Sequence, residues 1–281
     1  MQAGRWFADL DVALFLNYYR TEGPALEIPR DALGNSGVTD FGIDRLDAGL
    51  KIGYKDLTLN TRLIRLEQGP YFGLLLAVND ESDLDAWFAL SELAYRHRFG
   101  RNGSLSARTY LVQGMEDFYW ELLPEGTGPF TDGMIGNPSG EEQMRGFKAQ
   151  FDYRAAEAHL LTVGAVVERK SVYDTKHIAN FDPLTGAPIG PVQDITEGGN
   201  YIREETRAIW AVYLQDDWDV TDDVNLVFGI RHDRYSDFGG TTNPRVAAVW
   251  HFARGWDAKL MYGTAFMAPT FSALYFINNP A

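Results

Sequence analysis

Apolar and polar residues alternate along residues 224–266. Val224, Leu226, Phe228 and Ile230 occupy successive even positions, and most residues between them are small or polar. The same parity resumes after a short break at residues 237–240. Because side chains of a β-strand point alternately to opposite faces, this pattern indicates strands with one apolar and one polar face. We therefore expect three consecutive strands in this stretch.

The alternation recurs in the preceding part of the chain, in segments separated by polar breaks that contain glycine and proline. Eight further strands are expected at residues 5–19, 42–54, 57–67, 85–99, 104–113, 143–154, 159–169 and 205–218. The first of these is interpreted as one uninterrupted strand, because Trp6, Ala8, Leu10 and Val12 keep a single parity. The sequence thus predicts an all-β protein of about eleven strands.

The breaks alternate between long and short with one exception, residues 237–242, which stand at a long position but are themselves brief. The long breaks are residues 20–41, 68–84, 114–142 and 170–204, and the short ones are residues 55–56, 100–103, 155–158, 219–223 and 253–256. In an up-and-down antiparallel sheet every second connection lies at the same end, so tight turns gather at one end and large loops at the other. This asymmetry is typical of outer-membrane barrels, whereas soluble sandwiches use Greek-key crossings. Strands of about 11–15 residues also suit a tilted crossing of a bilayer.

An odd number of strands gives the two edges of the sheet the same direction. Such edges cannot pair in an ordinary antiparallel barrel, and bacterial single-chain barrels have even strand numbers. We therefore predict an antiparallel up-and-down transmembrane β-barrel that is partial, an arc of a larger barrel.

Composition narrows the function. The chain has 281 residues, a formal charge of −14 and a pI near 4.7, which argues against nucleic acid as a partner because phosphates require a basic surface. It has no cysteine, which excludes thiol nucleophiles and cysteine-based zinc sites. The longest apolar run, residues 71–78, is too short for a membrane helix. Aromatic residues make up 14% of the chain and often lie near strand ends, as in the aromatic girdles of membrane barrels. No signal-peptide pattern opens the sequence.

Four stretches in the last quarter of the chain resemble the barrel of TonB-dependent outer-membrane receptors. They are Tyr213-Leu214-Gln215-Asp216-Asp217-Trp218, residues 229–240 from Gly229-Ile230-Arg231-His232-Asp233 onward, Asn243-Pro244-Arg245, and residues 262–271 with Ala268-Pro269-Thr270, continued by Leu274-Tyr275 and Asn279-Pro280. The chain departs from the family pattern at Met267, Thr270 and Ala273, where arginine, serine and glutamate are frequent.

The resemblance implies uptake of iron–siderophore complexes, haem or cobalamin across the outer membrane of a Gram-negative bacterium. It implies a barrel of about 22 strands whose lumen is closed by a plug domain that contacts the TonB complex. We expect residues 1–281 to form one segment of that barrel, with the plug domain and the final strands absent. Its partners would be a metal chelate, the TonB complex through the plug, and outer-membrane lipid.

Two of the long breaks contain candidate ligand-binding residues. Aromatic side chains beside carboxylates can bind a flat or cationic ligand by stacking and by charge. The candidates are Phe118, Tyr119 and Trp120 in the break at residues 114–142, and Tyr173, His177 and Tyr201 in the break at residues 170–204. The alternative for each is a place in an interface girdle or in the packing of the loop itself.

Four polar residues of the last strands are candidates for the lumen wall, namely Arg231, Asp233, Arg245 and Lys259. By the resemblance they would face the plug, and the alternative is a hydrated wall without specific contacts. The histidines show no i, i+4 or HExxH spacing, so we expect neither a protein metal site nor a cofactor.

Three other functions remain open from the sequence alone. A passive porin-like or adhesin barrel would use the same alternation without a plug. A barrel-borne lipid hydrolase would need a serine and a histidine at adjacent lipid-facing positions, although no GxSxG pattern is present. A soluble β protein would bury the apolar face against a second sheet. An enzyme is not expected.

Overall fold

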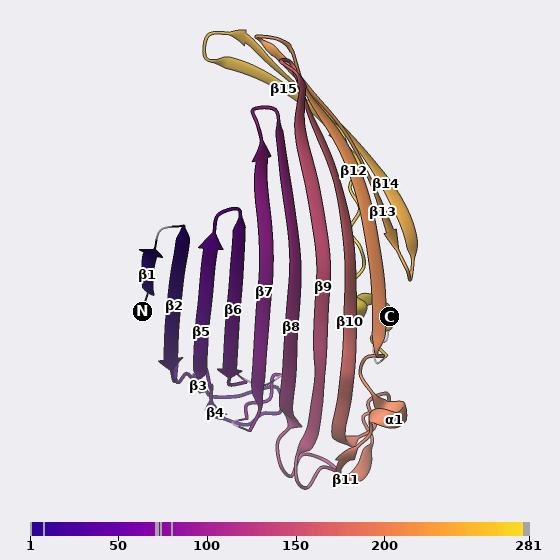
Figure 1. The fold of residues 1–281 in the computed structure, drawn as a ribbon. Coiled ribbons are helices and arrows are strands. Elements are labelled where there is room, and N and C mark those ends of the chain that lie inside the picture. Colours follow the sequence, from indigo (N-terminus) through magenta and orange to yellow (C-terminus); the bar gives the residue numbers. More distant parts are fainter. Residues whose placement is uncertain (1, 8, 71–72, 74, 80, 278–281) are drawn as a thin grey trace.

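The computed structural model describes residues 2–7, 9–70, 73, 75–79 and 81–277. Within them twelve strands follow one another in chain order in one antiparallel meander (Figure 1). These strands are β1 (Gln2–Phe7), β2 (Leu10–Thr21), β5 (Ile43–Tyr54), β6 (Leu57–Gln68), β7 (Asp83–Phe99), β8 (Gly103–Leu123), β9 (Met134–Ala156), β10 (His159–Phe181), β12 (Glu205–Thr221), β13 (Val224–Tyr235), β14 (Gly239–Ala253) and β15 (Trp256–Gly263).

Smaller elements occupy the long connections. β3 (Glu27–Ile28) pairs with β4 (Gly37–Val38), and β11 (Pro188–Asp194) folds back onto β10. Two short helices complete the fold, α1 (Thr196–Gly199) and α2 (Phe271–Tyr275). Among the described residues no helix has the length and apolarity needed to cross a membrane.

The predicted up-and-down sheet is confirmed. Tight turns lie at one end of the curved sheet, and the connections that carry β3, β4, β11 and α1 lie at the other (Figure 1). In the described part of the chain β1 pairs only with β2 and β15 only with β14, so the sheet is an open arc rather than a closed barrel. This agrees with the partial barrel expected from the sequence.

The expected first strand, residues 5–19, is wrong as a single element. It breaks into a hairpin in which Phe7 of β1 pairs with Leu10 of β2. The turn contains no glycine or proline, and apolar residues on both arms keep the same parity through it, so the pattern gave no sign of the reversal. The extra strand also removes the argument that an odd number of strands prevents closure, because the two edge strands of a twelve-stranded meander run in opposite directions.

The expected breaks at residues 114–142 and 170–204 are also too long. β8 continues to Leu123, β9 begins at Met134, and β10 continues to Phe181. These segments mix glycine, proline and charged residues, which lowers strand propensity, but the backbone still pairs because the neighbouring long strands supply partners. Asn279, Pro280 and part of the apolar run at residues 71–78 lie outside the described residues.

The two faces of the sheet differ as the alternation predicts. One face exposes large apolar side chains, for example Phe147, Val167 and Trp210, with Val167 at 60% exposure. The other face carries a network of polar contacts, such as the ion pair of Arg62 with Asp47, whose closest atoms are 2.5 Å apart. Among the described residues no large side chain is fully buried, as expected for a wall one sheet thick.

Aromatic rings on the polar face lie over glycines of the neighbouring strand. Four directly paired positions show this arrangement, Phe15 with Gly49, Phe88 with Gly114, Tyr110 with Gly146 and Tyr213 with Gly164. A Cβ on any of these glycines would overlap the ring. Aromatic coverage of this kind compensates for the missing glycine side chain and fixes the register of the pair.

Candidate functional site

An aromatic cavity of ≈ 420 Å³ lies on the polar face, near the end of the sheet that carries the long connections. Strands β8, β9 and β10, the segment before β12 and helix α2 all contribute to it. Its aromatic lining consists of Phe118, Trp120, His177, Phe181, Tyr201 and Phe276. A small apolar cluster of Phe130, Met134, Ala179 and Phe181 supports it from the long-connection end.

Four of the six predicted ligand-binding residues come together in this cavity. Phe118 and Trp120 share one face of β8 because they are two residues apart, and their ring centroids are 4.8 Å apart. Tyr119 lies between them and therefore points to the opposite face, in register with Asp83 of β7. The sequence analysis placed the three residues together in a loop. In the structure they belong to a strand, whose alternating side chains put Tyr119 on the face opposite to Phe118 and Trp120.

A β-bulge explains why Tyr173 and His177 separate although both have odd numbers. The pairing of β10 with β9 shifts between Tyr173 and Lys176, and Asp174 has a left-handed φ of 48°. Val172 lines the cavity before the bulge and His177 lines it after, so the bulge exchanges the faces of odd and even positions. Tyr173 is left on the other face, away from the cavity.

His177 is held in one orientation at the cavity wall. Its Nδ1 is 2.8 Å from the carbonyl oxygen of Gly199, so Nδ1 carries the proton and Nε2 is the acceptor of the neutral ring. β10 pairs with β12 only from His159 to Val172, which places His177 beyond the membrane-crossing part of the strand. Burial lowers the pKa of His177, so the imidazole is neutral near neutral pH.

Tyr201 packs against His177 with ring centroids 6.2 Å apart, and its hydroxyl donates to the carbonyl oxygen of Ser139 at 3.1 Å. Burial, followed by the negative charge of Glu116, raises the pKa of Tyr201 to about 12. Gly140 makes room for this side chain, because a Cβ there would lie 2.7 Å from the Tyr201 hydroxyl. The phenol is therefore neutral and fixed.

The charged side chains that line the aromatic cavity are all carboxylates. Glu116 of β8 and Glu142 of β9 line it from strands paired next to each other, and Glu141 is also part of the lining. Neither lysine nor arginine occurs among the described lining residues. The cavity thus combines aromatic surface with negative charge. This is the combination of aromatic side chains and carboxylates from which the sequence analysis predicted binding of a flat or cationic ligand.

A crossing segment, residues 264–277, runs from β14 over β13 to β12 on the polar face. The Thr264 N–H donates to Pro244 at one end, and the Ile277 N–H donates to Tyr201 at the other. Phe266 contributes to a second cavity described below, whereas Ser272 and Phe276 line the aromatic cavity. Sequence analysis identified part of this segment as a family motif but did not predict where the segment lies in the fold.

Arg207 of β12 fastens the crossing segment. Its side chain is 5% exposed, Nε donates to Asp237 at 2.8 Å, and Nη1 donates to the carbonyl oxygen of Pro269 at 2.8 Å. Nη2 lies 2.7 Å from the same Asp237 oxygen, a charge contact rather than an aligned hydrogen bond. The guanidinium carbon is 4.8 Å from the ring centroids of both Phe238 and Phe271. The alternation of apolar and polar residues did not single out Arg207, because many arginines occupy polar strand positions in this sequence.

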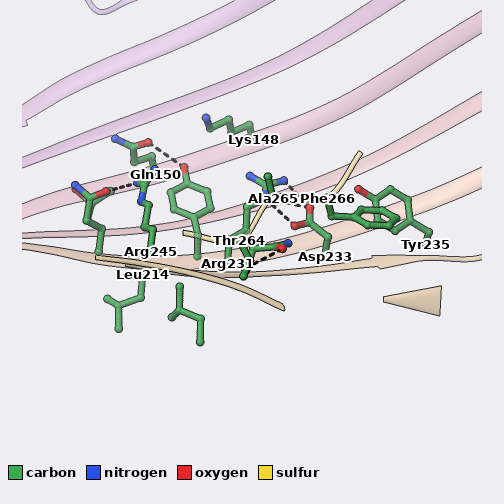
Figure 2. A pocket seen from close by; sticks show the side chains of 15 residues that line it. Lys148, Gln150, Leu214, Arg231, Asp233, Tyr235, Arg245, Thr264, Ala265 and Phe266 are labelled. Carbon is green, nitrogen blue, oxygen red and sulfur yellow. Dashed lines mark hydrogen bonds and ion pairs between the residues drawn. The ribbon is translucent and has the colours of Figure 1, made fainter. Parts of the chain in front are cut away.

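Three of the four predicted lumen residues gather in a second, polar cavity of ≈ 650 Å³ (Figure 2). Arg231 is bound to Asp233 through Nε at 2.8 Å, and Arg245 is hydrogen-bonded to Gln215. Lys259 lies on exposed β15, opposite Val249, and does not reach this cavity. Whether this face lines a lumen remains a prediction.

Lys148 and Arg245 of this polar cavity have no carboxylate partner among the described residues. Figure 2 shows Lys148 above the Arg231–Asp233 pair, and the Tyr213 hydroxyl donates to Gln150 at 2.9 Å nearby. The two cavities on one face therefore differ in charge, the first acidic and aromatic, the second polar and partly basic.

Metal-binding groups are not assembled in the part of the chain that the structure describes. No three His, Cys, Asp or Glu side chains gather closely enough to hold a metal ion there. The histidine side chains that bond to another side chain in that part contact aspartate or threonine, as His159 contacts Asp216 and His232 contacts Thr242.

Comparison with known proteins gives the family. The family model "TonB dependent receptor-like, beta-barrel" matches residues 8–281. The iron-regulated outer membrane virulence protein of Vibrio cholerae serotype O1 is 35% identical over 60 residues, 21% of this chain and 9% of that protein. The probable TonB-dependent siderophore receptor PirA of Acinetobacter baumannii is 23% identical over 254 residues, 84% of this chain. The chain spans 33% of the length of PirA.

Solved structures share the fold at low sequence identity. The FrpB iron transporter of Neisseria meningitidis, F3-3 variant, superposes with a TM-score of 0.66 at 16% identity, covering 95% of this chain and 44% of that one. The ferric enterobactin receptor PfeA of Pseudomonas aeruginosa, as its G324V mutant, gives a TM-score of 0.65 at 12% identity, covering 95% and 41%. With its open antiparallel meander, its long connections at one end and a family match that covers nearly its whole length, the chain belongs to the TonB-dependent receptor-like β-barrel family.

Proposed function

We propose that the protein takes up ferric chelates across the outer membrane of a Gram-negative bacterium. The described strands supply barrel wall, and the aromatic cavity at the long-connection end receives the ligand from outside the cell. In the whole protein a plug would close the lumen and couple uptake to the TonB complex. Iron–siderophore complexes are favoured here over haem and cobalamin.

The observation that carries this proposal is the aromatic cavity itself. Residues far apart in the chain, such as Trp120, His177 and Phe276, converge on one concave surface of ≈ 420 Å³. Ligand sites of this volume, mainly apolar with a few placed polar groups, are typical of small-molecule recognition. The fixed rings of His177 and Tyr201 reduce the conformational entropy lost on binding.

The relatives support iron as the cargo. The V. cholerae protein is named for iron regulation, and the A. baumannii protein is named as a probable siderophore receptor. A passive porin would leave the aromatic cavity without a purpose, because diffusion through a pore does not require a converging set of rings. We therefore do not favour the porin or adhesin alternative.

The test is growth under iron restriction. The gene that encodes this chain would be expressed in a bacterium that lacks its own ferric-chelate receptors, with and without a functional TonB. A double variant, Trp120→Ala with Tyr201→Ala, removes two cavity walls. Trp256→Ala is the matched control, because Trp256, the first residue of β15, is 67% exposed.

We expect growth on at least one ferric siderophore, dependent on TonB and lost in the double variant but not in the control. Growth that is equal without TonB would instead indicate passive diffusion. Loss of growth in the control to the same degree would show that any aromatic truncation disables the barrel, and the aromatic cavity would lose its assigned role.

A further inference from the structure

We propose that the aromatic cavity selects ferric chelates of zero or positive net charge and rejects polyanionic ones. This inference rests on the proposed function and adds the chemical class of the ligand. It follows from the charges and dipoles that line the cavity, and from the absence of lysine and arginine among the described lining residues.

The fixed charges of the lining are negative. Glu116 and Glu142 are both exposed to solvent and line the cavity from adjacent strands, with Glu116 in register with Gly140 and Glu142 with Gly114. A chelate in the cavity approaches both carboxylates. Because unlike charges attract and like charges repel strongly in a partly desolvated site, these groups favour a cation and oppose an anion.

The uncharged groups add to this preference. The faces of aromatic rings carry the negative part of their quadrupole, so Phe118, Trp120 and Phe276 present surfaces that attract cations. The Nε2 atom of His177 is an acceptor, because Nδ1 donates to Gly199. The Tyr201 proton is engaged by Ser139 and is not offered to a ligand.

Four basic residues of the elements that form the cavity do not offset this field, because each of the four is paired with a carboxylate. Lys170 pairs with Glu168 at 3.2 Å, Lys176 pairs with Asp174 at 3.2 Å, and Arg203 pairs with Glu205 at 3.1 Å. Arg207, the nearest arginine of β12 to the crossing segment, is buried against Asp237. An anionic chelate would have to break one of these pairs to gain a counter-charge.

The chemistry of ferric chelates separates into classes on this criterion. Three hydroxamate groups carry three negative charges and cancel those of the ferric ion, so a tris-hydroxamate complex is neutral, and it becomes cationic with a free ammonium group. Three catecholate groups carry six negative charges, which leaves three on the complex. The cavity fits the first class, through stacking on the rings and donation to the carboxylates.

The experiment measures binding of labelled iron complexes to outer-membrane vesicles from cells that express the gene. The probes are ferrioxamine B, which is a tris-hydroxamate with an ammonium group, its neutral N-acetyl derivative, and ferric enterobactin, which is a tris-catecholate. The variant is Glu116→Gln with Glu142→Gln, which keeps shape and removes charge. Glu125→Gln with Asp132→Asn, at exposed positions of the β8–β9 connection, removes the same two charges away from the cavity and controls for net charge.

We expect the order ferrioxamine B, then its neutral derivative, with ferric enterobactin at least about tenfold weaker than either. The double variant should bind ferrioxamine B about tenfold more weakly and lose most of the preference, whereas the control should match the unmodified protein. Ferric enterobactin binding as tightly as ferrioxamine B, or a preference unchanged by the double variant, would overturn the charge selection while leaving ferric-chelate uptake intact. Binding of none of the three would overturn the proposed function itself.

Discussion

Replacing Arg207 by alanine should release the crossing segment, residues 264–277, from the polar face. The guanidinium joins three parts of the structure, because it binds Asp237 in the β13–β14 turn, donates to the carbonyl oxygen of Pro269, and lies between the rings of Phe238 and Phe271. Alanine removes all of these contacts at once. Asp237 then keeps only the hydroxyl of Tyr275, at 3.0 Å, among its side-chain partners in the described residues.

The size of the effect follows from the burial of this pair. Removing one partner of a buried ion pair costs about 3–5 kcal/mol, because it leaves the other charge uncompensated. The retained Tyr275 bond to Asp237 favours the lower end of that range, and the lost stacking on two rings adds about 1 kcal/mol. A total of about 4 kcal/mol corresponds to a rise of about a thousandfold in the local opening equilibrium.

Hydrogen exchange of peptides from residues 264–277 measures this opening directly. The amide protons of Thr264, Phe276 and Ile277, which are hydrogen-bonded in the structure, should exchange about a thousandfold faster in Arg207→Ala. Arg203→Ala is the control, because Arg203 also stacks on Tyr275, at 4.9 Å, but is 62% exposed. It should change exchange by about threefold or less. Equal effects of the two substitutions, or unchanged exchange in Arg207→Ala, would refute the idea that Arg207 holds the segment.

Three further predictions concern the aromatic cavity and its bulge. Gly140→Ala should weaken chelate binding in titrations, because its Cβ would displace the Tyr201 hydroxyl, and Gly140→Ala with Tyr201→Phe should recover part of that loss. Since burial lowers the pKa of His177 from 6.5, its stabilising contribution is complete above pH 6.5 and is lost as the pH falls below it. The imidazolium would also face Glu116, Glu142 and the neutral Tyr201 in the cavity and would repel a cationic chelate. In titrations between pH 7 and 5, the affinity for ferrioxamine B should therefore fall less in His177→Gln than in the unmodified protein. Asp174→Gly should raise the thermal midpoint of unfolding, because glycine removes about 1 kcal/mol of left-handed strain, whereas Asp174→Val should lower it.

Much of the fold could be predicted from alternation and from the lengths of the breaks. The period of two is strong because each strand separates lipid-facing from polar residues, as in Val246 and Arg245 of β14, and the tight turns are marked by residues such as Gly100 and Gly255. The hairpin at Phe7 and Leu10 was not predicted, because its turn contains neither glycine nor proline. Periodicity reports which face a residue occupies and does not report where the chain reverses.

The candidate site could be predicted in composition and only partly in geometry. Aromatic residues beside carboxylates were visible in the sequence, but the pairing that moves Tyr119 and Tyr173 out of the cavity depends on strand extent and on a bulge. Phe276 joins the cavity only through the crossing segment, whose path depends on the long-range bond of Arg207 to Pro269. Contacts of this kind leave no local periodic signal.

The bulge at Asp174 divides β10 into two parts that can change independently in evolution. Up to Val172 the strand is held in register by both β9 and β12, whereas beyond the bulge it pairs with β9 and β11. An insertion or deletion of one residue at Asp174 would turn His177 away from the cavity and bring a neighbouring residue to the cavity wall. The lipid-facing side chains of β10 before the bulge would keep their positions. Ligand specificity can thus diversify through single-codon length changes while the membrane wall stays constant.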